Sequence, residues 1–169
     1  MLNEFDREKS VDHLVRAALK AVAPHGMVLI IEPGTRSASK GLIRLREDTK
    51  KYVPIAGPCL GARTCPYAKM PRAGWCFSEL HGEEPEWYTP LREAAGIQQA
   101  RLTYSWLSFG PPRPHKTPVA RVISGWMKAG HYLCTDEGRI LVQGLHGRPR
   151  RGALLDLERQ HRAGLKRRR

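Results

Sequence analysis

The chain lacks the signatures of the common nucleotide and hydrolase enzymes. No G-x-G-x-x-G follows an expected strand and no G-x-x-x-x-G-K-[ST] occurs, so neither a complete dinucleotide fingerprint nor a nucleoside triphosphate loop is visible. H-E-x-x-H and G-x-S-x-G are missing as well, and no spacing of Ser, His and Asp predicts a triad. We therefore assign no catalytic residue from the sequence.

Long apolar runs are missing too. The longest, residues 27–31, has the length of a strand, and no stretch of about eighteen apolar residues is present that would form a membrane helix. Residues 1–8 do not contain the apolar segment of a secretory signal. We therefore expect a soluble protein with no membrane partner, located in the cytoplasm of a prokaryote or, alternatively, in the mitochondrial matrix.

Acidic residues are few for the number of basic ones. Lys and Arg number 29 against 16 Asp and Glu, which gives a net charge of +13. Such a charge favours a polyanionic partner, because each phosphate contact releases condensed counterions. Nucleic acid is the leading partner, and a merely basic, solvated surface is the alternative.

Cysteine is rare, but its four copies are not scattered. Cys59, Cys65 and Cys76 fall within eighteen positions rich in Pro and Gly, and 57 residues separate Cys76 from Cys134. Unrelated buried thiols and two disulfides are alternatives, although disulfides need an oxidising compartment. The close C-x(2-4)-C pair typical of structural zinc is absent. Wide spacing and Pro66 directly after Cys65 suit an iron–sulfur cluster better than zinc.

The hydrophobic pattern predicts an α/β domain. Apolar residues at helical spacing predict a helix over 10–23, and a second helix is expected to end near Lys51. The continuous apolar run after the first helix is typical of a strand buried on both faces of a parallel sheet. A turn containing Gly138 predicts a hairpin. Strands are expected over residues 27–32, 53–56, 101–109, 119–127, 132–135 and 139–143.

The composition changes in the last 22 residues. Nine Arg or Lys against two acids account for +7 of the net +13. We expect residues 148–169 to be a basic tail, disordered or helical when free, that binds RNA. The residues predicted to contact RNA are Arg148, Arg150, Arg151, Arg162, Lys166, Arg167, Arg168 and Arg169.

Several motifs together resemble one known family. They are Asn3-Glu4-Phe5, Glu32-Pro33-Gly34-Thr35, Cys65-Pro66, Trp75-Cys76-Phe77, the strand over 102–108 and the segment 130–139 around Cys134. In this order they resemble the methyltransferase-like proteins of small-ribosomal-subunit assembly, found in mitochondria, bacteria and archaea. The resemblance spans residues 3 to about 145.

The resemblance implies a fold, a cofactor and a partner. The implied fold is α/β: the C-terminal half of a Rossmann-like methyltransferase sheet with an inserted cysteine loop, an antiparallel β extension and a basic tail. The implied domains are residues 1–147 and 148–169. The implied cofactor is a 4Fe–4S cluster, with zinc as the alternative, and the implied partner is small-subunit ribosomal RNA. The cluster ligands carried over from the family are Cys59, Cys65, Cys76 and Cys134.

One departure from the family bears on catalysis. Asn3 would lie at the end of the fourth methyltransferase strand, so the first strands, which hold S-adenosylmethionine, would be missing. We expect a factor that is not catalytic alone and does not bind S-adenosylmethionine by itself. It would be a natural half, an RNA-binding remnant or a fragment. The alternatives are a methyltransferase completed by a separately encoded N-terminal half, and a small zinc-binding, nucleic-acid-binding module.

Overall fold

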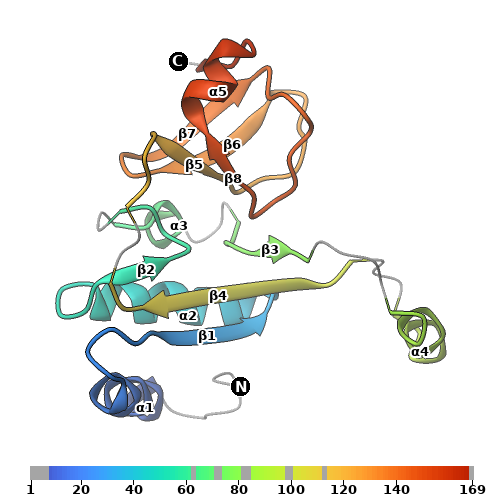
Figure 1. Cartoon of the computed structure of the whole chain (residues 1–169). Coiled ribbons are helices and arrows are strands. Elements are labelled where there is room, and N and C mark those ends of the chain that lie inside the picture. The colour runs from blue at the N-terminus through green and yellow to red at the C-terminus, as the bar shows by residue number, and fades with distance from the viewer. Residues whose placement is uncertain are drawn as a thin grey trace.

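Two antiparallel sheets make up the fold, one from each part of the chain (Figure 1). The computed structural model describes residues 8–61, 64–70, 74–80, 85–97, 101–111 and 114–167. The motif Asn3-Glu4-Phe5 lies outside the described residues. The mixed α/β class is confirmed, whereas the link to a methyltransferase sheet stays a prediction.

The N-terminal sheet has the strand order β1-β4-β2, and β3 also pairs with β4. Helices α1 and α2 pack on one face of this sheet, where Phe109 and Leu107 of β4 meet Val15, Leu42 and Leu45. The elements of this part are α1 (Glu8–Ala21), β1 (Val28–Pro33), α2 (Arg36–Thr49), β2 (Ile55–Gly57), α3 (Pro66–Lys69), β3 (Ser78–Glu79), α4 (Tyr88–Ala94) and β4 (Thr103–Phe109).

Helix α2 begins at the turn that follows β1. Thr35 is its N-cap, and the Thr35 hydroxyl accepts a hydrogen bond from the Ala38 N–H at 3.3 Å. Gly34 precedes the cap because a Cβ there would come within 2.5 Å of the Thr103 side chain. This tight turn sets the direction in which α2 crosses the sheet.

The environment predicted for β1 is wrong. The strand is antiparallel to β4, not part of a parallel sheet, and its burial alternates along the chain. Leu29 is 54% exposed and Ile31 is 55% exposed, while Val28 and Ile30 pack against the helices. Helices α1 and α2 pack on the same face of the sheet, so the side chains on the other face of β1 stay exposed. A continuous apolar run in the sequence does not reveal whether one face or both faces of the strand will be covered.

The C-terminal sheet has the strand order β8-β5-β6-β7-β9 and curls into a half-barrel (Figure 1). Its core consists of small apolar side chains with Leu133 and Val142 fully buried. The predicted hairpin is confirmed, because Thr135 pairs with Gly138 across the turn between β6 and β7. The elements are β5 (Val119–Val122), β6 (His131–Thr135), β7 (Gly138–Gln143), β8 (Leu154–Asp156), α5 (Leu157–Arg162) and β9 (Lys166–Arg167).

The segment expected to be a basic tail is built into this sheet over its described part, residues 148–167. Strand β8 pairs with β5 and strand β9 pairs with β7, and α5 lies between them. Leu155 and Leu165 are buried in the core. Helix α5 agrees with the expectation of a helix, whereas the residues on either side of it form strands. The burial of the two leucines stabilises these strands, and a count of charges alone does not show this apolar contribution.

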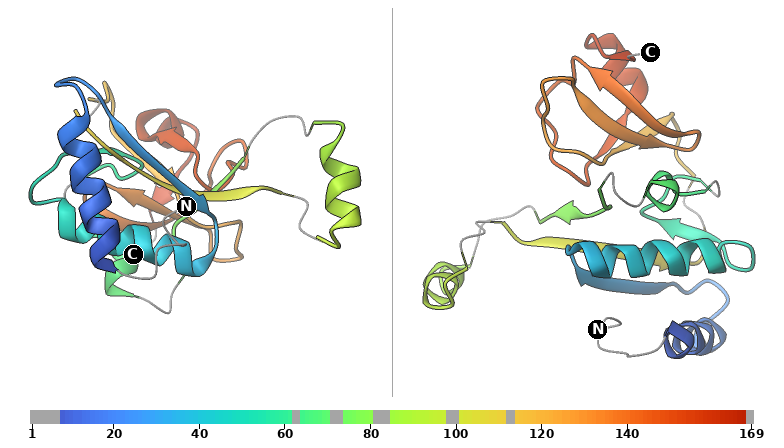
Figure 2. Two further views of the ribbon diagram at one scale, coloured as in Figure 1. Left: turned by 90° about the horizontal axis from the view of Figure 1, so that it is seen from below. Right: turned by 180° about the vertical axis from the view of Figure 1, so that it is seen from behind.

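Helix α4 stands away from the rest of the described structure in both views of Figure 2. None of its residues is buried. Among the described residues, no helix combines the length and the apolar character that crossing a membrane requires.

Candidate metal centre

A cavity between the two sheets is lined by all four cysteines. Cys59 follows β2, Cys65 is the N-cap of α3, Cys76 precedes β3 and Cys134 lies on β6. The cavity opens to the surface, and Arg46 and Arg121 line it beside the cysteines. All four cysteines are described, and none forms a disulfide. The structure thus brings the remote cysteine to the three local ones.

The cysteine loop is fixed at its C-terminal end by hydrogen bonds to the N-terminal sheet and α2. The carbonyl oxygen of Cys76 accepts hydrogen bonds from Ser39 Oγ at 2.6 Å and from Ser105 Oγ at 2.9 Å. The neighbouring Trp75 donates its indole N–H to the Gly34 carbonyl at 2.8 Å. Cys76 is therefore held from α2, β4 and the turn after β1.

The middle of the loop is tied to the C-terminal sheet instead. Pro66 occupies the first turn of α3, where its missing N–H costs nothing. The buried Tyr67 that follows donates its hydroxyl to the carbonyl of Ile123, just beyond β5, at 3.1 Å. Cys65, Tyr67 and Ile123 form a small core with Ile43 of α2, against which Cys134 packs. Cys65, Cys76 and Cys134 therefore lie in or against the core that joins the two sheets.

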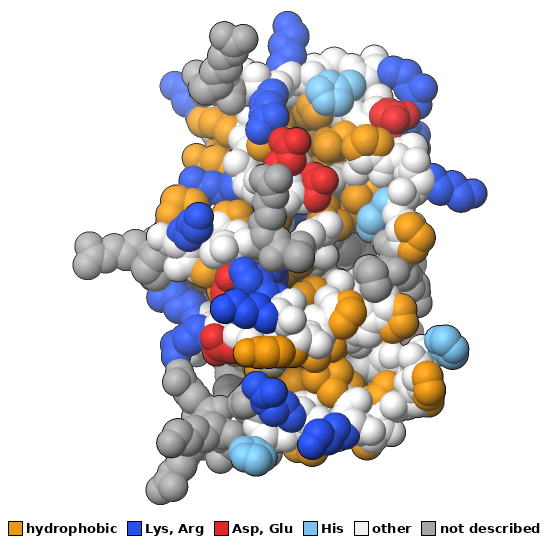
Figure 3. All heavy atoms as spheres, turned by 90° about the vertical axis from the view of Figure 1, so that its left-hand side faces the viewer, with side chains coloured by type: hydrophobic (Ala, Val, Ile, Leu, Met, Phe, Trp, Pro, Cys, Tyr) orange, Lys and Arg blue, Asp and Glu red, His pale blue; other side chains and the backbone are white. Residues whose placement is uncertain are grey.

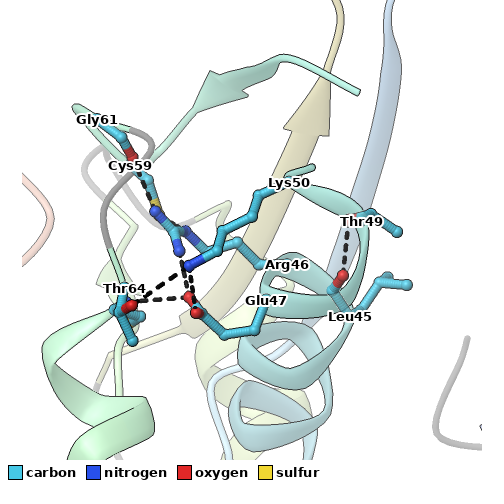
Figure 4. A network of polar contacts seen from close by, with 9 residues as sticks. Leu45, Arg46, Glu47, Thr49, Lys50, Cys59, Gly61 and Thr64 are labelled. Atoms are coloured by element: carbon cyan, nitrogen blue, oxygen red, sulfur yellow. Dashed lines mark hydrogen bonds and ion pairs between the residues drawn. The ribbon is translucent and has the colours of Figure 1, made fainter. Parts of the chain in front are cut away.

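Two adjacent residues of α2 hold the beginning of the loop (Figure 4). Arg46 donates from Nε to Cys59 Sγ at 3.0 Å and from Nη2 to the Gly61 carbonyl at 2.8 Å. Glu47 pairs with Arg46 and accepts the Cys65 backbone N–H at 3.0 Å. One turn of helix thereby positions two of the four cysteines.

A second buried arginine lines the same cavity. Arg121 on β5 is 7% exposed, donates from Nη2 to Ser78 Oγ at 2.5 Å and lies over the Trp106 ring at 5.4 Å. Its Nε is buried and has no hydrogen-bond partner among the described residues. A buried cation with an unsatisfied donor fits an anionic group in the cavity.

Three thiols of this cavity have raised pKa values and are hard to ionise. Burial raises the pKa of Cys134 to about 12, with the neighbouring cysteines adding to the rise. Burial also raises the pKa of Cys76 to about 11, although Arg121 opposes part of the increase, and it raises the pKa of Cys65. At neutral pH these groups stay protonated unless a metal replaces the proton.

The geometry argues against a site already shaped for one metal ion. Among the described residues, no group of three or more His, Cys, Asp or Glu side chains is placed to hold a single ion. A tetrahedral zinc site, with zinc–sulfur bonds of about 2.3 Å, needs sulfurs only about 3.8 Å apart. A cluster is several ångströms across and keeps its four sulfurs further apart. Four thiols and two buried guanidinium groups line one cavity, and they are the ligands and counter-charges that a thiolate-bound centre, a cluster or zinc, requires.

The chain was compared with known proteins. The family described as mitochondrial small ribosomal subunit Rsm22 matches residues 1–134. The chain belongs to this family. No curated protein matches the chain. The Rsm22 match extends from the N-terminus to Cys134 and so contains all four cysteines, whereas β7, β8, α5 and β9 lie beyond it.

The residues predicted to contact RNA lie in the part of this Rsm22-family chain beyond the match. Arg151 serves the fold, because it donates to the Ile123 carbonyl at 2.9 Å and lies over the Phe77 ring at 4.1 Å. Arg168 and Arg169 are outside the described residues. The remaining five are exposed: Arg148, Arg150, Arg162, Lys166 and Arg167.

Basic side chains also occur outside that segment. On the face drawn in Figure 3, Lys and Arg extend from the N-terminal to the C-terminal part of the molecule, with acidic side chains between them. The positive charge of this face is therefore not gathered in one patch.

Sequence reasoning missed the two arginines that line the cavity. Arg46 follows buried positions Leu42 and Leu45 at helical spacing, so an inward-facing charge on α2 was a detectable signal. Arg121 lies between buried Ala120 and Val122 in a short strand, and no local pattern marks it as buried.

Proposed function

We propose that this chain is an iron–sulfur-cluster-binding, rRNA-binding factor of small-ribosomal-subunit assembly that is not catalytic alone. Cys59, Cys65, Cys76 and Cys134 would hold a 4Fe–4S cluster. The cluster would supply a covalent connection between the two sheets and a negative charge facing Arg46 and Arg121.

One observation carries the cluster: four cysteines from two separate sheets line a single cavity with two buried arginines. Each arginine is costly to bury alone, and four thiolates are costly to bury alone. Together around inorganic iron and sulfide, their charges offset one another. The wide spacing of the cysteines in the sequence and Pro66 directly after Cys65 support a cluster over zinc.

Metal analysis of protein purified without oxygen tests this proposal. About four iron and four sulfide per chain, with broad absorbance near 400 nm, are expected for one cluster of this type. Replacing Cys134 by Ser should lower the iron content, whereas replacing the neighbouring Thr135 by Ser should not. Stoichiometric zinc without iron would refute the cluster and favour the zinc-binding alternative.

The rRNA part of the proposal rests on family and charge. The family description names the small ribosomal subunit, and the net charge of +13 favours a polyanion. The loop between β7 and β8, helix α5 and strand β9 present five exposed basic residues on a folded support. A binding assay with small-subunit rRNA at several salt concentrations tests this, and salt-independent binding would refute an electrostatic contact with phosphates.

A second candidate function is methyl transfer completed by a separately encoded N-terminal half. It is favoured by β1, which pairs with β4 and with no other described strand. An unpaired edge accepts a further strand, and exposed Leu29 and Ile31 beside it would be covered by added helices. In this arrangement the other half would supply the strands that bind S-adenosylmethionine.

Reconstitution with such a half distinguishes the two functions. Leu29→Ser combined with Ile31→Ser should weaken the association, whereas Leu14→Ser, at another exposed apolar position, should not. Calorimetry that detects no S-adenosylmethionine binding by the assembled pair would exclude methyl transfer. For the compartment we propose the cytoplasm of a prokaryote or, alternatively, the mitochondrial matrix, which agrees with a family described as mitochondrial.

A further inference from the structure

Arg46 occupies an inward-facing position of α2. Leu42 and Leu45 are buried on the same helix, and Arg46 itself is only 3% exposed. Burying a guanidinium group is costly, because its charge loses hydration water that only an anion or several hydrogen-bond acceptors replace. The partners of the Arg46 guanidinium group therefore indicate the role of this buried residue.

The guanidinium group contacts the first cysteine of the candidate site directly (Figure 4). Its Nε donates to Cys59 Sγ at 3.0 Å, and its Nη2 donates to the Gly61 carbonyl at 2.8 Å. Both acceptors lie in one short turn after β2, so a single planar fork fixes the sulfur and the backbone behind it. A lysine ammonium, a compact point charge, cannot reproduce this paired geometry.

The charges beside Cys59 complement a negative sulfur. Glu47 forms ion pairs with Arg46 and, at 2.6 Å, with Lys50 Nζ, so one carboxylate faces two cations. The side chain of Arg46 is 4% exposed, that of Glu47 is 20% exposed and that of Lys50 is 15% exposed. A protonated thiol adds no negative charge to this group, whereas a metal-bound thiolate does.

We propose that Arg46 is a positioning residue of the metal centre, which holds the Cys59 turn in place and raises the reduction potential of the cluster by donating a hydrogen bond to the Cys59 sulfur. This inference rests on the proposed iron–sulfur function. Reduction adds negative charge to a cluster, and hydrogen bonds to its sulfurs stabilise that charge. Among the described arginines and lysines, Arg46 is the one that donates a hydrogen bond to a cysteine sulfur.

Three variants of the full chain test the proposal. Arg46→Gln removes the charge and the fork, Arg46→Lys keeps the charge and removes the fork, and Arg44→Gln removes a charge from an exposed position of the same helix. Each protein is reconstituted with iron and sulfide without oxygen. Spectroelectrochemistry then measures the reduction potential, and a chelator measures the rate of iron loss.

We expect Arg46→Gln to have a more negative potential than the wild type and to lose iron ~10–100-fold faster, the usual cost of removing a partner of a metal ligand. Arg46→Lys should have a potential between those two proteins and a loss rate close to that of Arg46→Gln. Arg44→Gln should match the wild type in both measurements. If Arg46→Gln takes up no iron, the Arg46→Lys variant becomes the test. A reduction potential and a rate of iron loss equal to those of the wild type in Arg46→Lys would then overturn the proposal.

Three other results overturn it. Arg46→Gln with the wild-type potential and loss rate would show that the hydrogen bond is irrelevant to the cluster. Faster iron loss with an unchanged potential would show a loosened loop and no effect on the cluster itself. Wild-type protein that takes up no iron refutes the proposed function and this inference with it. Loaded wild type beside an indistinguishable Arg46→Gln refutes this inference alone.

Discussion

Replacing Cys134 by Ser separates a cluster that connects the two sheets from a group bound by the loop alone. Cys134 lies on β6 of the C-terminal sheet, whereas the other three cysteines follow β2 of the N-terminal sheet. A cluster bound by all four would close a loop containing the 57 residues between Cys76 and Cys134. Such a closure restricts the unfolded chain and so stabilises the folded one.

The expected stabilisation follows from the length of that loop. The chain-entropy relation for a covalent cross-link gives roughly 4 kcal/mol for a loop of this size. That is a large share of the ~5–15 kcal/mol that separates a typical folded domain from its unfolded state. Serine is close to cysteine in size and Cys134 is half-buried, so the substitution itself should cost little. Loaded wild type should therefore melt roughly 8–16 °C above Cys134→Ser.

Thermal unfolding without oxygen measures the difference in melting temperature, and urea unfolding followed by tryptophan fluorescence measures the difference in free energy. Each protein is compared with and without iron, so that the effect of the cluster is separated from the effect of the side chain. Thr135→Ser is the matched control, because it changes the adjacent residue and keeps the hydroxyl that donates to the Gly138 carbonyl at 3.0 Å. The reasoning fails if iron stabilises Cys134→Ser as much as the wild type, or if iron leaves the wild type no more stable.

Three further predictions concern the C-terminal sheet, RNA binding and the N-terminal core. Gly130→Ala should destabilise the fold by roughly 3 kcal/mol or more in the same urea assay, since a Cβ there overlaps the Val142 carbonyl oxygen. The control Gly138→Ala has a similar positive φ but open space around the Cβ, so it should cost about 1–2 kcal/mol. Phe109→Ala, at a fully buried position of β4, should cost about 3–5 kcal/mol by thermal unfolding, and a loss under 1 kcal/mol would contradict the described core. Removing four exposed charges of the C-terminal segment should lower the slope of log K against log salt for rRNA binding by about 3, whereas removing four from the N-terminal part should leave it nearly unchanged. An equal change in both would show that the RNA does not prefer the C-terminal segment. The first set is Arg148, Arg150, Arg162 and Lys166, and the control set is Lys20, Arg44, Lys51 and Lys69, each replaced by Gln.

Local elements were predictable from the sequence because their signals are local. The spacing of apolar residues predicted the helix that the structure places at Glu8–Ala21, and the turn before Gly138 predicted the β6–β7 hairpin. The surroundings of β1 were not predictable in this way. Its apolar run is compatible with either sheet type, and pairing with β4, some seventy-five residues later, made the sheet antiparallel.

The candidate site shows the same division. The four cysteines were identifiable by their number and grouping, and Arg46 could have been found from its helical spacing to Leu42 and Leu45. Arg121 could not, because a charged side chain is normally placed on the surface and no local pattern marks this one as buried. Arg121 of the C-terminal sheet contacts Ser78 and Trp106 of the N-terminal sheet, so its burial depends on the two sheets packing against each other. The ligand role of the cysteines stays a prediction until iron is measured.

The sequence was enough to identify the cysteine-rich loop, the basic balance of charge, the short helices and strands, and the resemblance to a ribosome-assembly family, which already grouped Cys134 with that loop. The three-dimensional fold was needed to show that the C-terminal basic segment folds into a sheet and that two arginines face the cavity. Composition and periodicity depend on neighbouring residues, whereas these contacts depend on long-range strand pairing, whose partners no local pattern specifies.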